Sequence, residues 1–336
     1  MAVLPGNRVK LAVLLVLVVC GALLGCGAGT RVAVTAAGEA SPPASDEVSR
    51  LSPSLGDLQV FPPDSPWNTD ISKYPVHPNS ANFIASIGAD KPLHPCFGGP
   101  YEGRPNGIPY SLVKGDQPKV PVTIVEYADE SDPGPYPIPD DAPVEGGSDA
   151  QGDRHSLVID TDNKILYEVG GAFKTPDGWR VGAGAIFDLR SNKLRPLGWT
   201  STDAAGLPIF PGLVRYDEVV EKGEINHALR FTVTRSQRGY IFPATHFASS
   251  SKDPNLAPMG LRVRLKADYD ISGFPKEVQV ILRCLKKYGM IVADNGGDWF
   301  VTGAPDPRWD DEALSAMKRV KGSDFEVVDT GPVHTD

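Results

Sequence analysis

The segment GEINHALRFTVTRSQRGYIFPATHFASS, residues 223–250, is followed by PMGLRVRLKADYDI, residues 258–271, and by YGMIVADNGGDWFVTG, residues 288–303. The apolar runs in these stretches are short, rich in β-branched and aromatic residues, and interrupted by polar groups. Alternation of this kind is typical of strands with one buried face. Polar side chains set into strands cost free energy unless they are paired or used. The stretches therefore indicate both the fold class and the place to look for a site.

The rest of the chain continues the same pattern, and the 35 glycines and 32 prolines of the whole sequence favour many turns. The fold class that follows is mainly β: a single β-sandwich or jelly-roll-like domain with a few short helices. Helices are predicted after Asn79, after Pro275 and over 310–320. Strands are predicted at 110–113, 120–127, 155–160, 164–169, 179–189, 228–234, 239–242 and 259–267, with 290–293 and 299–302 as a closing hairpin.

The first 25 residues have the pattern of a lipoprotein-type signal peptide. Arg8 and Lys10 precede the apolar run 11–24, and Leu23-Leu24-Gly25-Cys26 resembles a bacterial lipobox with Cys26 as the lipidated residue. Cleavage without lipidation and an uncleaved anchor helix are the alternatives. The prediction is an extracytoplasmic protein, either a membrane lipoprotein or secreted, that meets the membrane only through a lipid anchor. Residues 26–56 are predicted to be a disordered tether, 57–330 the β-rich domain and 331–336 a polar tail.

Charge and motif content exclude several function classes. The net charge of −9, with no basic face, argues against a nucleic-acid partner. The chain has no Gly-x-Ser-x-Gly elbow, phosphate-binding loop, His-Glu-x-x-His pair or Cys-x-x-Cys pair, which argues against α/β-hydrolases, nucleotide enzymes and zinc proteases. Cys96 and Cys284 are expected either to pair as a disulfide or to remain as thiols.

Histidines on or beside strands are the first group of candidate site residues. His155, His227 and His246 would form a cupin-like metal site if all three converged. Without a metal, a histidine assisted by Tyr240 and Arg230 suits proton abstraction from a uronic acid, and hence lytic cleavage of a polysaccharide.

Carboxylates support hydrolysis instead, because glycosidases use two acids that face each other across a cleft. Asp294 is the best single candidate, since Ile291-Val292-Ala293 gives it a buried approach, and Asp203 is its proposed partner. Trp199 and Trp299 are candidate sugar-stacking residues. Arg262, Arg264 and Lys266 alternate along one strand and are candidates for binding anionic groups of a substrate.

Several runs resemble a widespread family of secreted bacterial proteins and lipoproteins to which no activity is assigned. The resemblance implies a single secreted domain and nothing about chemistry, while a more general similarity links the chain to polysaccharide-active jelly-roll proteins. The runs are GDRHSLVID (152–160), GAIFDL (184–189), GWTSTDAAGLPIFPGLVRYDEV (198–219), HALRFTV (227–233), PATH (243–246), PMGLRVRLKA (258–267) and KYGMIVADNGGDW (287–299).

The functional prediction is a secreted or lipid-anchored carbohydrate-active protein that cleaves a polysaccharide, as a hydrolase or a lyase. Its partner is a polysaccharide or cell-envelope glycan. No cofactor is expected, although a metal is left open. The rival class is a non-catalytic module that binds a cell-surface glycan, with the histidines serving structure alone.

Replacing the lipidated cysteine tests the anchor. Cys26→Ser is expected to move the protein from the membrane fraction to the soluble fraction, because the thiol that carries the lipid is gone. Fractionation of cells followed by immunoblotting measures this. Membrane attachment equal to that of the wild type would contradict the lipobox prediction.

Overall fold

A computed structural model of the protein describes residues 52–335, so the predicted signal peptide, Cys26 and most of the tether lie outside the described residues. The prediction of a mainly β fold with few short helices is confirmed, with 26% of residues in strands and 16% in helices. Within residues 52–335, no helix has the length and apolar character needed to cross a membrane.

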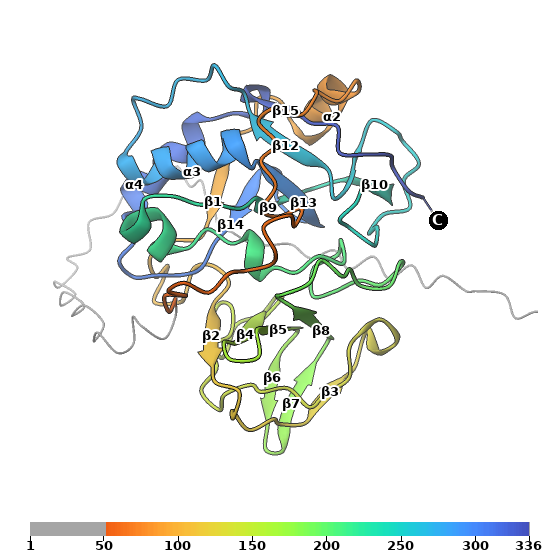
Figure 1. Cartoon of the computed structure of the whole chain (residues 1–336), viewed down its shortest axis with the longest axis vertical. Helices are drawn as coiled ribbons and strands as arrows, with labels where there is room; N and C mark the ends of the chain where they lie inside the picture. The colour runs from red at the N-terminus through yellow and green to blue at the C-terminus, as the bar shows by residue number, and fades with distance from the viewer. Residues whose placement is uncertain (1–51, 336) are drawn as a thin grey trace, which may run out of the picture.

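A six-stranded sheet forms the upper lobe in Figure 1, in the order β1 (His94–Cys96), β14 (Phe300–Thr302), β9 (Leu229–Val233), β13 (Met290–Asn295), β12 (Arg262–Leu265) and β15 (Phe325–Val327). Strand β9 pairs parallel with β13 on one edge and antiparallel with β14 on the other. The predicted hairpin between 290–293 and 299–302 is therefore wrong. The two strands are separated by β9, every residue of which is buried.

Helices cover this sheet. Helix α3 (Lys276–Lys287) begins directly after Pro275, as predicted, and packs against β12. Helix α2 (Ser80–Ile87) lies against β15, and the predicted C-terminal helix is present as α4 (Asp311–Ser315) continued by a 3-10 turn. The other short helical segments are η1 (Ala128–Glu130), η2 (Phe210–Gly212), η3 (Asp217–Lys222), η4 (Ala316–Arg319) and η5 (Gly322–Asp324).

The lower lobe in Figure 1 contains two smaller sheets. One has the order β2 (Tyr110–Val113), β4 (Ser156–Asp160), β5 (Ile165–Gly170) and β8 (Ala183–Asp188). The other has the order β3 (Val122–Ile124), β7 (Gly178–Val181) and β6 (Phe173–Thr175). The strand predicted at 179–189 is thus divided at Gly182 between two sheets. A separate pair, β10 (Ser236–Tyr240) and β11 (Ala257–Met259), lies beside the upper lobe.

Both faces of the four-stranded sheet are buried. Along β4, Leu157 and Ile159 join the large hydrophobic core, whereas Val158 belongs to a smaller core shared with the three-stranded sheet. The large core continues through the segment 205–214 into the six-stranded sheet. Because one core contains side chains from both lobes, the lobes are held together by apolar packing.

The proline-rich segment 132–140 lies over the lower lobe. Its Tyr136 is fully buried and packs against the bare face of Gly184, where a Cβ would lie 2.7 Å from the phenol oxygen. Gly184 therefore serves the packing of a crossing segment rather than the approach of a ligand.

Two glycines with similar positive φ angles test how closely the turn after β11 approaches Ile241, the residue that follows β10. A Cβ on Gly260 (φ +78°) would lie 1.9 Å from the carbonyl oxygen of Ile241, whereas a Cβ on Gly223 (φ +74°) meets nothing within 4 Å. We expect Gly223→Ala to lower the free energy of unfolding by about 1–2 kcal/mol and Gly260→Ala by about 3 kcal/mol or more. Urea denaturation measures both, and equal losses would contradict the close approach.

Candidate functional site

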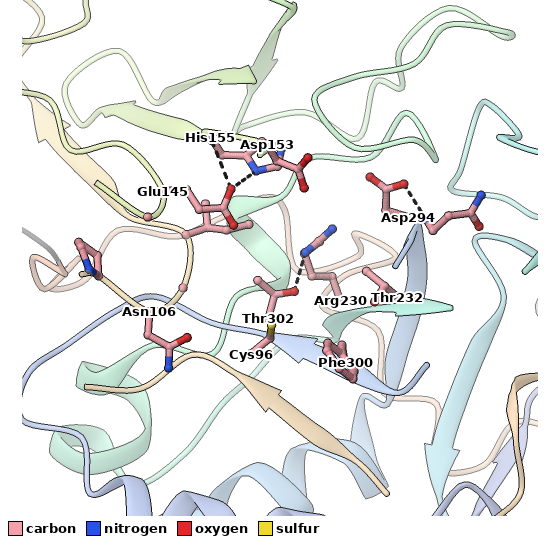
Figure 2. Close-up of a pocket in the computed structure, with 15 residues that line it drawn as sticks. Cys96, Asn106, Glu145, Asp153, His155, Arg230, Thr232, Asp294, Phe300 and Thr302 are labelled. Atoms are coloured by element: carbon pink, nitrogen blue, oxygen red, sulfur yellow. Dashed lines mark hydrogen bonds and ion pairs between the residues drawn. The ribbon is translucent and has the colours of Figure 1, made fainter. Parts of the chain in front are cut away.

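A cavity of about 180 Å³ lies where the two lobes meet. The upper lobe contributes Arg230 from β9 and Asp294 from β13, and the lower lobe contributes Glu145, Asp153 and His155. Figure 2 shows the charged side chains from both lobes directed toward this space. Its remaining lining residues are uncharged, and they include Asn106, Thr232, Phe300 and Thr302.

Arg230 lies at the base of the cavity in a buried ion pair with Asp203. Its Nε donates to Asp203 Oδ2 at 2.9 Å and its Nη2 to Asp203 Oδ1 at 2.6 Å, while Nη1 donates to Thr302 Oγ1 at 2.5 Å. Asp203 is 1% exposed and does not line the cavity. Burial opposes the charge on Arg230, but Asp203 outweighs it and raises the pKa of the guanidinium. Arg230 is therefore a fixed cation whose partner lies behind it.

Asp294 reaches the cavity because of a β-bulge. The register between β13 and β9 shifts between Val292 and Asp294, which leaves Ala293 outside the ladder. The carbonyl of Ala293 instead accepts a hydrogen bond from the N–H of Ala205 at 2.9 Å. A bulge of this kind redirects the next side chain, and here it places Asp294 beside Thr232 in the lining of the cavity.

The surroundings of Asp294 favour its protonated form. Burial, followed by the negative charge of Asp203, raises the pKa of Asp294 to about 8, although Arg230 and the N–H of Asn295 oppose the shift. The N–H of Asn295 donates to its Oδ1 at 2.6 Å and that of Ala204 to its Oδ2 at 3.4 Å. At neutral pH, Asp294 is consequently a carboxylic acid with a proton to donate.

Glu145 and His155 form a second ion pair on the opposite wall. His155 Nδ1 lies 2.6 Å from Glu145 Oε2, and His155 Nε2 lies 3.1 Å from the carbonyl oxygen of Thr202. Both ring nitrogens face acceptors, so both must carry protons. Burial lowers the pKa of His155, but Glu145 outweighs it and raises the pKa to about 10. His155 is therefore an imidazolium at neutral pH, and it lowers the pKa of Glu145 despite burial.

Asp153, like Asp294, is a cavity carboxyl group that neither ion pair includes. No side-chain hydrogen bond within residues 52–335 ties its carboxylate, which lines the cavity opposite Asp294 in Figure 2. Burial raises the pKa of Asp153, and the nearby His155 cation opposes this shift. The cavity thus contains one ionised carboxylate, Asp153, which can act as a base or nucleophile, and one protonated carboxyl group, Asp294, which can act as an acid.

The same wall contains a group of potential metal-ligating side chains. Donor atoms of Glu145, Asp153 and His155 lie within 4.8 Å of one another. Carboxylate and imidazole groups do bind divalent metals, but a histidine ligand must be deprotonated at the ligating nitrogen. Both nitrogens of His155 are already used as donors, so the donor chemistry fits an ion-pair cluster better than a metal site.

The segment 202–205 connects the groups of the cavity to one another. The carbonyl of Thr202 accepts a hydrogen bond from His155, and the carboxylate of Asp203 is paired with Arg230. The N–H of Ala204 donates to Asp294, and the N–H of Ala205 donates to the carbonyl of Ala293 in the bulge. Glu168 of β5 fixes this segment from the lower lobe. It is fully buried, and it accepts hydrogen bonds from Thr202 Oγ1 at 3.1 Å and from the N–H groups of residues 209 and 210 at 2.9 Å each.

Sequence candidates outside the cavity have structural partners. His227 Nε2 lies 3.1 Å from Glu218, within a buried cluster, and the carbonyl of His227 accepts from the thiol of Cys284. His246 donates from Nδ1 to the carbonyl of Ala204 at 2.8 Å, and Tyr240 stacks on a histidine near the C-terminus. The three predicted histidines therefore do not converge, and within residues 52–335 the potential ligand group includes only His155 of the three.

The residues predicted to bind substrate mostly serve the fold. Arg262 is buried and donates to the carbonyl of Tyr288, and Arg264 pairs with Glu326 at 2.7 Å. Lys266 donates to the carbonyl of Ser323, so the three cations hold neighbouring segments rather than forming an open row.

The two tryptophans differ in exposure. Trp299 is fully buried between the rings of Phe231 and Phe325, which makes it a core residue that no sugar reaches. Trp199 is half-buried, and the guanidinium of Arg195 lies over its ring.

Sequence reasoning missed two charged residues of the cavity, Asp153 and Glu145. Asp153 stands in the run Asp153-Arg154-His155, directly before a clearly predicted strand, and only His155 of this run was predicted to be a site residue. Glu145 lies in an irregular segment, and nothing local distinguishes it from the exposed acids of other loops. Its role depends on contact with His155, ten residues later in the chain.

No protein-family model, curated protein or solved structure matches the chain. Function is therefore inferred from the cavity.

The raised pKa of Asp294 predicts how the free energy of unfolding changes with pH. The unfolded pKa of Asp294 is 3.8 and the folded one about 8, so the folded protein holds this proton more tightly. Its stabilising contribution is complete below about pH 4 and is lost as the pH rises to about 8. We expect the free energy of unfolding to fall less over this range in Asp294→Asn than in the wild type.

Denaturant titrations at several pH values measure this difference. The exposed Asp268→Asn is the matched control and should follow the wild type. Parallel curves for Asp294→Asn and the wild type would show that Asp294 titrates in the folded state as an ordinary carboxyl.

Proposed function

We propose that the protein hydrolyses glycosidic bonds of a polysaccharide, with Asp294 as the general acid and Asp153 as its partner carboxylate. One observation carries the proposal: two carboxyl groups from different lobes face one cavity, and Asp294 is held as the neutral acid. Glycoside hydrolysis needs this division of roles between two acids.

Asp294 would donate its proton to the oxygen of the leaving sugar. The resulting carboxylate would be stabilised by the cation of Arg230 and by the N–H groups of Ala204 and Asn295, all of which are already in place. Because these groups need no rearrangement, they favour the charge that develops during bond cleavage.

Asp153 would act on the anomeric carbon, either by activating a water molecule or by direct attack. It suits this role better than Glu145, whose carboxylate is already bonded to the imidazolium of His155. Asp153 also suits the role of partner carboxylate better than Asp203, the residue predicted for it from the sequence. Both carboxylate oxygens of Asp203 already accept hydrogen bonds from Arg230, and Asp203 does not line the cavity. Asp203 is instead a positioning residue.

Lytic elimination has less support than hydrolysis. The lytic mechanism predicted from the sequence needs an unprotonated histidine near the acidic C–H of a uronic acid, and His155, the histidine of the cavity, is protonated at neutral pH. His227, His246 and Tyr240 do not line the cavity. The signal peptide and lipid anchor predicted from residues 1–26 would place the enzyme beside cell-envelope glycans, which are its proposed partners.

Product mass distinguishes the classes of function. The purified domain from residue 27 onward, incubated with neutral, uronic and sulfated polysaccharides, is expected to release fragments that carry one added water. Asp294→Asn and Asp153→Asn should each lower kcat about 10²–10⁴-fold, because each removes one proton-transfer group. Asp268→Asn is the control.

The pH profile separates the two acids. In the wild type, kcat/KM should fall on the alkaline side near pH 8, as Asp294 loses its proton. Residual activity of Asp294→Asn should lack this alkaline limb. Unsaturated products, or retention on a glycan without cleavage, would contradict the hydrolase proposal.

A further inference from the structure

The size of the cavity limits what it can hold. Its volume is about 180 Å³. A cavity of about 150 Å³ accommodates one benzene ring, and sites for larger ligands commonly exceed about 300 Å³. The enclosed space between Asp153 and Asp294 therefore has room for about one six-membered ring. The cavity also opens to solvent, so further rings of a glycan would lie outside it.

The walls leave few ways for the cavity to widen. The ring of Phe300 is stacked on His94 with 4.3 Å between ring centroids, and a Cβ on Gly297 would lie 2.6 Å from the Phe300 ring, so the ring is packed against two neighbouring segments. On another side, Ile108 donates from its N–H to Gly303, and a Cβ on Gly107 would lie 2.4 Å from the same carbonyl oxygen. Enlarging the cavity would break these contacts.

The backbone of the opposite wall is also tied. The N–H of Glu145 donates to the carbonyl of His155 at 2.8 Å, in addition to the ion pair between their side chains. The base of the cavity is held by the three hydrogen bonds of Arg230 to Asp203 and Thr302. These three walls and the base of the cavity are thus each held by contacts within the protein.

The charges around the cavity select for a neutral ring. Arg230 is neutralised by Asp203 and His155 by Glu145, while the remaining lining residues other than Asp153 and Asp294 carry no charge. With Asp294 protonated, Asp153 leaves an excess negative charge. A carboxylate or sulfate on the bound sugar would be repelled by Asp153, and it could gain a cation only by breaking an existing ion pair.

We propose that the cavity binds one uncharged sugar ring at the end of a glycan chain, so that the enzyme removes terminal residues singly. The inference rests on the proposed hydrolase activity for its catalytic part, whereas the binding of a single neutral ring stands on the cavity alone. Hydroxyl groups of the ring would meet polar side chains at the base and rim, among them Asn106, Thr232 and Thr302.

Calorimetry on full-length Asp294→Asn tests the binding part. The probes are a panel of neutral methyl hexosides, the di- and trisaccharides of each sugar, and the corresponding methyl uronosides. For the sugar that binds, affinity should change by less than about threefold between one and three residues, since only one ring is enclosed. The uronoside should bind about tenfold more weakly or worse.

The charge argument has its own variant. Asp153→Asn should reduce the discrimination against the uronoside, because the unpaired negative charge is gone. Asp149→Asn, an exposed acid outside the cavity lining, should leave the discrimination unchanged. Equal affinities of Asp294→Asn, in which Asp153 is intact, for the neutral and charged rings would overturn the neutral-sugar assignment.

Early products of the wild-type enzyme test the catalytic part. Monosaccharide as the first product, with little loss of polymer viscosity, is the expected result. Oligosaccharides in the first turnovers, or a gain in affinity above about thirtyfold from one to three rings, would overturn the inference and leave hydrolysis standing. Binding of one ring without any cleavage would contradict the hydrolase proposal and leave the single-ring binding site standing. Binding of no sugar would contradict both the hydrolase proposal and the single-ring binding site.

Discussion

The buried ion pair between Arg230 and Asp203 is the interaction on which the site depends. Isolated charges in a protein interior are costly, and a pair is tolerated only when its hydrogen-bonding groups are satisfied. Here both carboxylate oxygens bind the guanidinium, and Thr302 binds the third nitrogen. The pair joins the central strand of the large sheet to the segment 202–205, so the strand and that segment share one fixed geometry.

The segment 202–205 also contributes to the different protonation states of the carboxyl groups of Asp294 and Asp153. Asp203 lies close enough to raise the pKa of Asp294, while Ala205 holds the bulge that directs Asp294 into the cavity. The carbonyl oxygen of Thr202, a residue that Glu168 positions, accepts a hydrogen bond from Nε2–H of His155. Glu145 keeps His155 a cation and is paired with it, so Asp153 remains the unpaired carboxylate. The segment 202–205 thus contacts charged groups of both walls, through its backbone and through the side chain of Asp203.

Sequence reasoning identified part of this arrangement. Asp294 was predicted because an apolar strand leads into an open Asn-Gly-Gly turn, and that signal is local. Arg230 and Asp203 were also singled out, but Asp203 was assigned to the cavity when it lies behind Arg230. Glu145 was missed because its environment is created by a residue on another element. Sequence reasoning also could not show that Arg262 and Arg264 have partners within the protein, because Tyr288 and Glu326 lie on segments distant in the chain.

The sequence by itself determined the local elements of this protein: the mainly β character, the helix after Pro275 and most strand positions. These depend on side-chain periodicity and turn residues, which act over a few positions. Only the tertiary structure decided that β9 lies between β13 and β14, and which charges are neutralised. Strand pairing and ion pairing join residues far apart in the chain, and the free energy of each charge depends on neighbours that only the folded chain brings together.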